Sequence, residues 1–118
     1  MESQEELQQL WARLIANAMD PTRDVRLRRE FIETLSRFEP VDAVVLEFVD
    51  NWYLTSDTRD PDKKYFLPET VPVGDLDVDT TVVSVENLEQ LRCLVTLGSS
   101  SRRSVTSFGK LLLRACRP

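Results

Sequence analysis

The segment 84–116 constrains the fold of this 118-residue chain most, because two kinds of hydrophobic periodicity follow one another in it. Ser84 is a favourable N-cap, and we expect a helix to begin there. The apolar side chains that follow at helical spacing are Val85, Leu88, Leu91 and Leu94. This part of the segment is therefore predicted to be an amphipathic helix with one buried face.

A β-hairpin and a closing helix are expected after it. Residues 95–97 resemble a strand, 98–101 a Gly-Ser turn and 102–105 a returning strand. Either Thr106 or Ser107 then caps the closing helix. The apolar side chains of that helix are Phe108, Leu111, Leu112 and Ala115. Helix, hairpin and closing helix is the order of the second half of a winged helix.

The N-terminal part, residues 1–53, is expected to form three helices. The first has an apolar stripe at helical spacing, made of Leu7, Leu10, Trp11, Leu14, Ile15 and Ala18. Ser3 is its expected N-cap. Asp20 ends it, because the residue before a proline disfavours helical geometry.

The second helix is predicted from about Val25 to Phe38, and the third begins at Pro40, which suits the first turn of a helix. The inner side chains of the second are Phe31, Ile32, Leu35 and Phe38. Those of the third are Val41, Val44, Val45, Phe48, Val49 and Trp52. Because this third face is so broad, we expect the third helix to be central and most buried.

Residues 54–83 are predicted to be an acidic loop with short strands at 65–67 and at 71–73. The carboxylates of Asp75, Asp77 and Asp79 alternate as in a calcium-binding loop, and Glu86 would be the twelfth position of that loop. The sixth position is threonine where such loops need glycine. Whether the acidic stretch 57–79 binds a cation stays open at this point.

Composition argues against an enzyme. The chain has no histidine, so it lacks the commonest general base and the commonest zinc ligand. Cys93 on the predicted helix and Cys116 on the closing helix are interpreted as buried hydrophobic residues, as are Trp11 and Trp52. We therefore expect no catalytic residues, no metal and no cofactor. The acidic N-terminus and the lack of a long apolar run predict a cytoplasmic protein without a membrane segment.

Charge is distributed unevenly along the chain. Residues 1–38 carry a net charge of −1, residues 39–89 carry −10 and residues 90–118 carry +6. The halves either neutralise each other, within or between subunits, or the basic end contacts a polyanion. The candidate nucleic-acid-binding residues are Arg92, Arg102, Arg103, Lys110 and Arg114. Glutamates on the predicted helix and a pI near 4.8 weigh against nucleic acid.

The sequence also resembles the abortive infection alpha family of bacterial phage-defence proteins, over nearly its whole length. The matching stretches are Leu10–Asp20 (LWARLIANAMD), Arg29–Leu35 (REFIETL), Pro40–Leu46 (PVDAVVL), Asn87–Leu91 (NLEQL) and Thr106–Cys116 (TSFGKLLLRAC). The chain departs from the family pattern at Glu39, where a capping serine is usual, and at Gln90, where arginine is frequent. Members of the family are usually longer, so the resemblance implies a C-terminal conserved domain or a short relative.

The resemblance implies a role in phage defence and supplies no catalytic residues. We interpret its motif residues as structural. Ala12, Ala16 and Ala18 would allow close helix packing. Asn17 and Asp20 would satisfy backbone groups at the end of their helix, and Gly109 would allow close approach to the hairpin.

The sequence thus predicts one α+β domain over 1–118, predominantly helical. Its parts are three helices over 1–53, the acidic loop over 54–83, and a winged-helix-like half over 84–118. The function expected is a non-catalytic protein-interaction or oligomerisation domain, whose partner is another protein or a second copy. The alternative is a winged-helix domain that binds nucleic acid through the basic last third.

Overall fold

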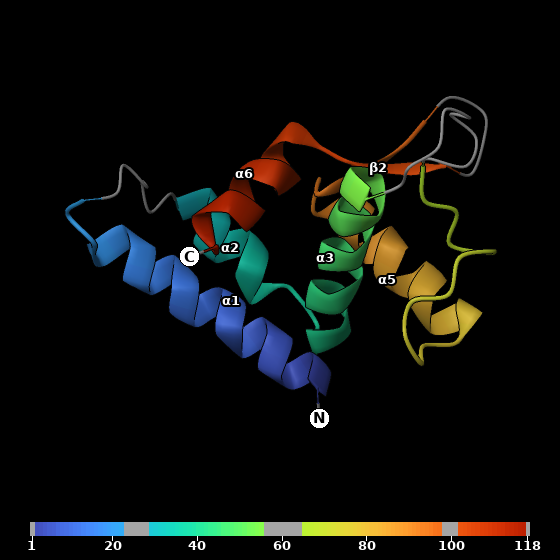
Figure 1. Ribbon diagram of the computed structural model, residues 1–118, viewed down its shortest axis with the longest axis horizontal. Helices are drawn as coiled ribbons and strands as arrows, with labels where there is room; N and C mark the ends of the chain where they lie inside the picture. The colour runs from blue at the N-terminus through green and yellow to red at the C-terminus, as the bar shows by residue number, and fades with distance from the viewer. Residues whose placement is uncertain (1, 23–28, 56–64, 98–101, 118) are drawn as a thin grey trace.

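The computed structural model describes residues 2–22, 29–55, 65–97 and 102–117, which form five helices and one two-stranded antiparallel sheet (Figure 1). The elements are α1 (Glu2–Met19), α2 (Arg29–Ser36), α3 (Pro40–Thr55), α5 (Val78–Gln90), β1 (Leu94–Thr96), β2 (Arg103–Val105) and α6 (Ser107–Ala115). The predicted class, α+β and mostly helical, is confirmed. No helix in the described ranges is long and apolar enough to span a membrane.

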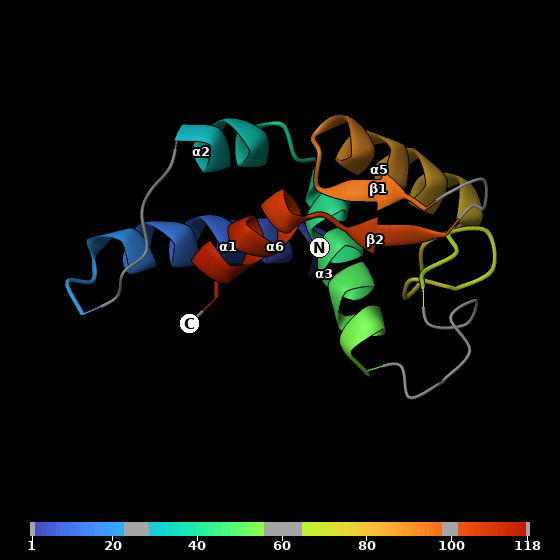
Figure 2. The same cartoon turned by 90° about the horizontal axis from the view of Figure 1, so that it is seen from above.

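Helix α3 is the central element, as its broad apolar face predicts. It packs against α1 on one side and against α5 and β2 on the other (Figures 1 and 2). Ala43, Val45, Leu46 and Val49 are buried. Burying an aliphatic side chain of this size contributes about 1.5–3 kcal/mol, so the packing of α3 is a main source of stability.

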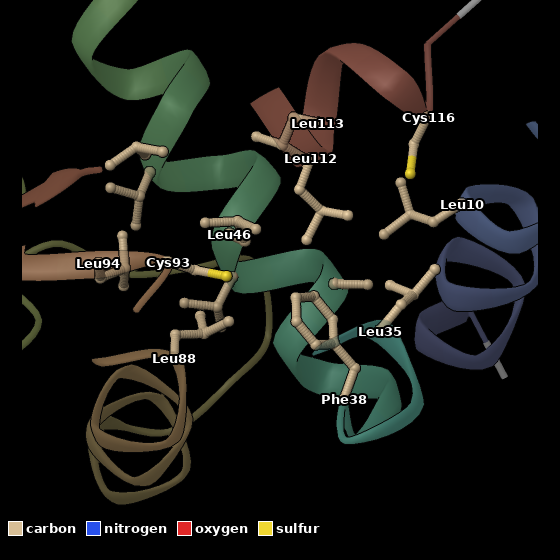
Figure 3. Packing of buried hydrophobic residues seen from close by; sticks show 14 of the residues in the cluster. Leu10, Leu35, Phe38, Leu46, Leu88, Cys93, Leu94, Leu112, Leu113 and Cys116 are labelled. Carbon is tan, nitrogen blue, oxygen red and sulfur yellow. The ribbon is translucent and has the colours of Figure 1, made fainter. Parts of the chain in front are cut away.

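One hydrophobic core joins the N-terminal helices to the C-terminal half. Figure 3 shows side chains from α1, α2, α3, α5, β1 and α6 meeting in it. The labelled residues are Leu10, Leu35, Phe38, Leu46, Leu88, Cys93, Leu94, Leu112, Leu113 and Cys116. Trp11 and Trp52 pack against this core from its edge, which confirms their interpretation as packing residues.

The N-terminal helices match the prediction with local corrections. Helix α1 begins at Glu2, so Ser3 lies inside it rather than at its N-cap. Ile15 is 50% exposed and Ile32 on α2 is 39% exposed, although both were expected inside. On α1 and α2, the predicted apolar face is therefore wider than the part of each helix that neighbouring elements cover.

Helices α2 and α3 are next along the chain. Residues 23–28, which include the predicted start of the second helix, lie outside the described residues, and α2 is described from Arg29. Phe38 follows the end of α2 and is buried. Helix α3 begins at Pro40 as predicted.

Helix α5 begins at Val78, six residues before the predicted start. Asp77 is the N-cap, and its Oδ1 accepts a hydrogen bond from the Thr80 N–H at 2.7 Å. The prediction of Ser84 as N-cap is therefore wrong: Ser84 lies in the middle of α5 and is buried. Aspartate and serine are equally favourable N-caps. The helix begins after Asp77 rather than after Ser84 because the longer helix packs more of its length against α3.

The predicted strands of the acidic loop are reduced to one bridge. Phe66 pairs with Arg103 in an isolated antiparallel bridge, and the Arg103 N–H donates to the Phe66 carbonyl at 2.8 Å. Residues 71–73 form no strand, although Val73 is buried in the core.

The hairpin is confirmed, but α5 ends at Gln90, so Leu94, which the spacing predicts on the helix, is instead the first residue of β1. Strand β1 pairs antiparallel with β2, and Leu94 lies opposite Val105, while the predicted turn at 98–101 is outside the described residues. Thr106 is the N-cap of α6, and its Oγ1 accepts a hydrogen bond from the Gly109 N–H. Cys93 lies between α5 and β1 rather than on the helix.

Candidate functional site

Arg103 and Arg92, two of the predicted nucleic-acid-binding residues, contact identified groups within the protein. On β2, Arg103 Nε lies 2.7 Å from Glu89 Oε1, and the Thr96 hydroxyl donates to the other oxygen of the same carboxylate at 3.0 Å. Arg92 was expected on the helix but follows it in a turn with φ 64°. Its guanidinium carbon lies 5.9 Å from the centre of the Phe108 ring.

The other three predicted residues lie on the hairpin and on α6. Arg102 precedes β2 and is half-buried. Lys110 and Arg114 are exposed on α6, four residues apart, so they lie on the same face of that helix. Leu111 lies beside them and is 43% exposed. The structure therefore brings Lys110 and Arg114 together on α6, and it places Arg103 against Glu89 of α5.

A buried carboxylate that the sequence interpretation missed accepts three hydrogen bonds. Asp42 is 1% exposed and accepts hydrogen bonds from the Ser84 hydroxyl at 2.7 Å and from Asn87 Nδ2 at 2.6 Å. It also accepts one from the Glu39 N–H at 2.8 Å, which is the reciprocal half of a capping box. Asp42 thus caps α3 and fastens α5 to it, even though no serine stands at position 39.

A second set of polar contacts fastens the two ends of the chain together. Asn17 Nδ2 on α1 donates to the carbonyl oxygens of Ala115 at 3.0 Å and Arg117 at 2.5 Å. The Arg117 guanidinium lies 2.6 Å from the buried Asp50 carboxylate on α3. Asn17 therefore satisfies carbonyls at the end of α6, not those of its own helix as predicted. Ala12 faces solvent.

Gly109 is required where α6 crosses the start of the hairpin. A Cβ at this position would lie 2.6 Å from the Cys93 carbonyl oxygen and 2.9 Å from Val105 Cγ1. The Thr106 hydroxyl donates to the Arg92 carbonyl at the same crossing. The predicted close approach of Gly109 to the hairpin is confirmed, whereas Ala16, like Ala12, is exposed rather than packed.

A groove runs between the start of α3 and the exposed side of α5, with a volume of about 600 Å³. The described residues that line it are Arg37, Glu39, Val41, Asp42, Asp79, Thr80, Val83, Ser84, Glu86, Asn87 and Gln90. Four of these are acids and one is a base, and Val83 is 65% exposed. The groove is thus acidic, and the apolar side chains of Val41 and Val83 are among those that line it. Sequence periodicity alone did not find it because it depends on the position of α5 against α3.

One of the carboxylates considered for a calcium site, that of Asp77, caps a helix instead. Asp77 is the N-cap of α5, and the hydrogen bonds that its carboxylate accepts from Thr80 lower the pKa of Asp77. Among the described residues, no three potential ligands come together in a cluster suited to a metal ion. Asp57, Asp60 and Asp62 lie outside the described residues.

Three other titratable groups are buried or half-buried. Burial raises the pKa of the Cys93 and Cys116 thiols to about 12, and neither cysteine forms a disulfide. Both therefore behave as the small hydrophobic residues predicted. Burial, and then the neighbouring Glu6 carboxylate, raises the pKa of Glu47 on α3.

The comparisons with known proteins add one finding. The protein-family model described as abortive infection alpha matches residues 1–116. A search of curated proteins and a search of solved structures each found no match. The stretches that carry the resemblance contain Asn17, Asp42, Asn87 and Gly109, which are the residues that fasten the helices together.

Proposed function

The chain belongs to the abortive infection alpha family, and we propose that it acts there as a non-catalytic protein-interaction domain whose binding surface is the groove beside α5. The single observation that carries this proposal is the exposed side of α5. Val83 is 65% exposed between the exposed acids Asp79 and Glu86. Val41 and Val83 both line the groove, and an apolar patch with a polar rim is a feature of protein contacts.

The polar groups of the fold support a role without catalysis. The chain has no histidine, and its two thiols have pKa values of about 12, so neither is a ready nucleophile at neutral pH. The buried Asp42 carboxylate accepts three hydrogen bonds from the protein itself. These groups are used to hold the fold.

Nucleic-acid binding is the second candidate, and exposed Lys110 and Arg114 favour it. In a winged helix, the helix before the hairpin would enter the major groove. Here that helix is α5, and its exposed Asp79 and Glu86 would be repelled by phosphates. The protein contact is therefore the better supported of the two.

A phage-challenge assay tests the proposal with the full-length protein in a bacterial host. Val83→Asp should abolish protection while the melting temperature stays unchanged, because Val83 is mostly outside the core. Glu69→Lys, at another exposed position, is the control and should protect normally. Full protection by Val83→Asp would refute the proposal. Loss of protection in Arg114→Ala, together with salt-sensitive binding of duplex DNA, would favour the second candidate.

A further inference from the structure

The exposed row on α5 has a defined pattern of charge. Asp79, Val83 and Glu86 are separated by four and three residues, so they lie on one face of the helix. The row therefore reads acid, apolar, acid. Hydrogen bonds from Ser84 and Asn87 to the buried carboxylate of α3 fix this helix in place.

The exposed row on α6 has the opposite charge. Lys110 and Arg114 are four residues apart and lie on one face of that helix. Leu111 is three residues before Arg114 and lies beside this pair of bases, and it is 43% exposed. The row therefore has two bases with an apolar side chain at their side. Its helix is also fixed, at its start by the Thr106 cap and at its end by Asn17.

We propose that the partner bound in the groove beside α5 is a second copy of this chain, which docks its α6 row there. This inference rests on the proposed function and names its partner. In the contact, Leu111 of one copy covers Val83 of the other. Lys110 and Arg114, which lie beside Leu111, then face Asp79 and Glu86, which lie on either side of Val83. Such a match of opposite charges favours this pairing over like-charged surfaces.

The two rows belong to one molecule but cannot meet within it. Both views show α5 and α6 apart, on different sides of the central α3 (Figures 1 and 2). The contact therefore joins two different surfaces of two copies. Contacts of this heterologous kind produce rings or open chains of subunits.

The geometry limits what else the groove accepts. Its exposed acids Glu39, Asp79 and Glu86 outnumber its one base, Arg37, among the described residues that line it. An occupant should therefore be basic and present an apolar side chain, whereas the acids would repel a nucleic acid. The α6 row, with its two bases and the exposed Leu111, meets both requirements.

Sedimentation velocity of the full chain tests the proposal over a concentration series, at about 50 mM and about 500 mM NaCl, where screening differs strongly. We expect association that weakens at the higher salt. Two charge-reversed proteins are compared, Asp79→Lys/Glu86→Lys and Lys110→Glu/Arg114→Glu. Each alone should associate about tenfold more weakly than the wild type. An equal mixture of the two should associate again, because each reversed row meets a complementary row on the other protein.

Glu33→Lys/Glu69→Lys is the matched control for Asp79→Lys/Glu86→Lys, since it raises the net charge by the same amount at exposed positions outside both rows. It should associate like the wild type, and circular dichroism should show every variant folded. A wild type that stays monomeric, or a mixture that stays dissociated, would overturn the inference. If Val83→Asp still abolishes protection in that case, the groove binds another protein and the proposed function stands. If Val83→Asp protects fully while the wild type associates, the proposed function fails and the self-association stands.

Discussion

Replacing Asp42 by alanine is expected to lower the free energy of unfolding by roughly 3 kcal/mol. A hydrogen bond to a charged group contributes about 1.5–3 kcal/mol, and Asp42 accepts three of them. The total is smaller than three times this value. Glu39 is exposed and Asn87 is half-buried, so water replaces the carboxylate there, whereas the hydroxyl of Ser84 is left buried without a partner.

Urea unfolding followed by tryptophan fluorescence measures this loss, with Ser84→Ala and the double variant completing a cycle. Ser84→Ala alone should cost about 1 kcal/mol, because the carboxylate keeps two donors. The double variant should cost less than the sum of the single ones by about 1 kcal/mol or more, because the orphaned hydroxyl is gone.

Two results of this double-mutant cycle would contradict a hydrogen-bonded link between Asp42 and Ser84. If Asp42→Ala costs less than about 1 kcal/mol, the carboxylate does not join α3 to α5 as its hydrogen bonds indicate. Exact additivity of Asp42→Ala and Ser84→Ala would mean that the two side chains do not interact. Either outcome would mean that the hydrogen bonds of Asp42 do not hold α5, and with it the exposed row, against α3.

Three further predictions concern packing and titration. Gly109→Ala should destabilise by about 1–3 kcal/mol in thermal unfolding because its Cβ meets Cys93 and Val105; equal stability would contradict the close approach. Cys93 and Cys116 should resist a thiol reagent at pH 8 until urea unfolds the protein, so rapid labelling in native buffer would show them accessible. Glu47→Gln should gain stability over the wild type as pH rises above 4.5. The folded state raises the pKa of Glu47, so the wild type loses stability through that window; a pH-independent difference in urea unfolding would count against it.

The spacing of apolar residues along the sequence predicts most of the helices of this fold. The apolar spacing of α1, α3 and α6 identifies these helices because one face of each is buried on a neighbour. The start of α5 was not predictable in the same way. Its first turns are rich in β-branched valine and threonine, which resemble a loop or strand, and packing against α3 makes them helical.

The candidate site was less accessible to sequence reasoning. Counting charges located the bases of the last third, but it did not show that Glu89 engages Arg103 across fourteen residues. Nor did it show that Arg92 lies in a left-handed turn over Phe108. Both facts depend on the path of the chain from α5 into the hairpin, which the spacing of residues does not specify.

The buried residues that hold the helices together are different from the exposed residues proposed to bind a partner. Asn17, Asp42 and Gly109 are buried and hold the helices at fixed positions, so a substitution there acts on folding. Val83 and Arg114 are exposed and contribute little to the core, so their replacement leaves the scaffold intact. The same scaffold can thus carry rows of different charge on α5 and α6. Because like-charged rows repel, the pattern of charge on these two helices decides which copies pair with one another.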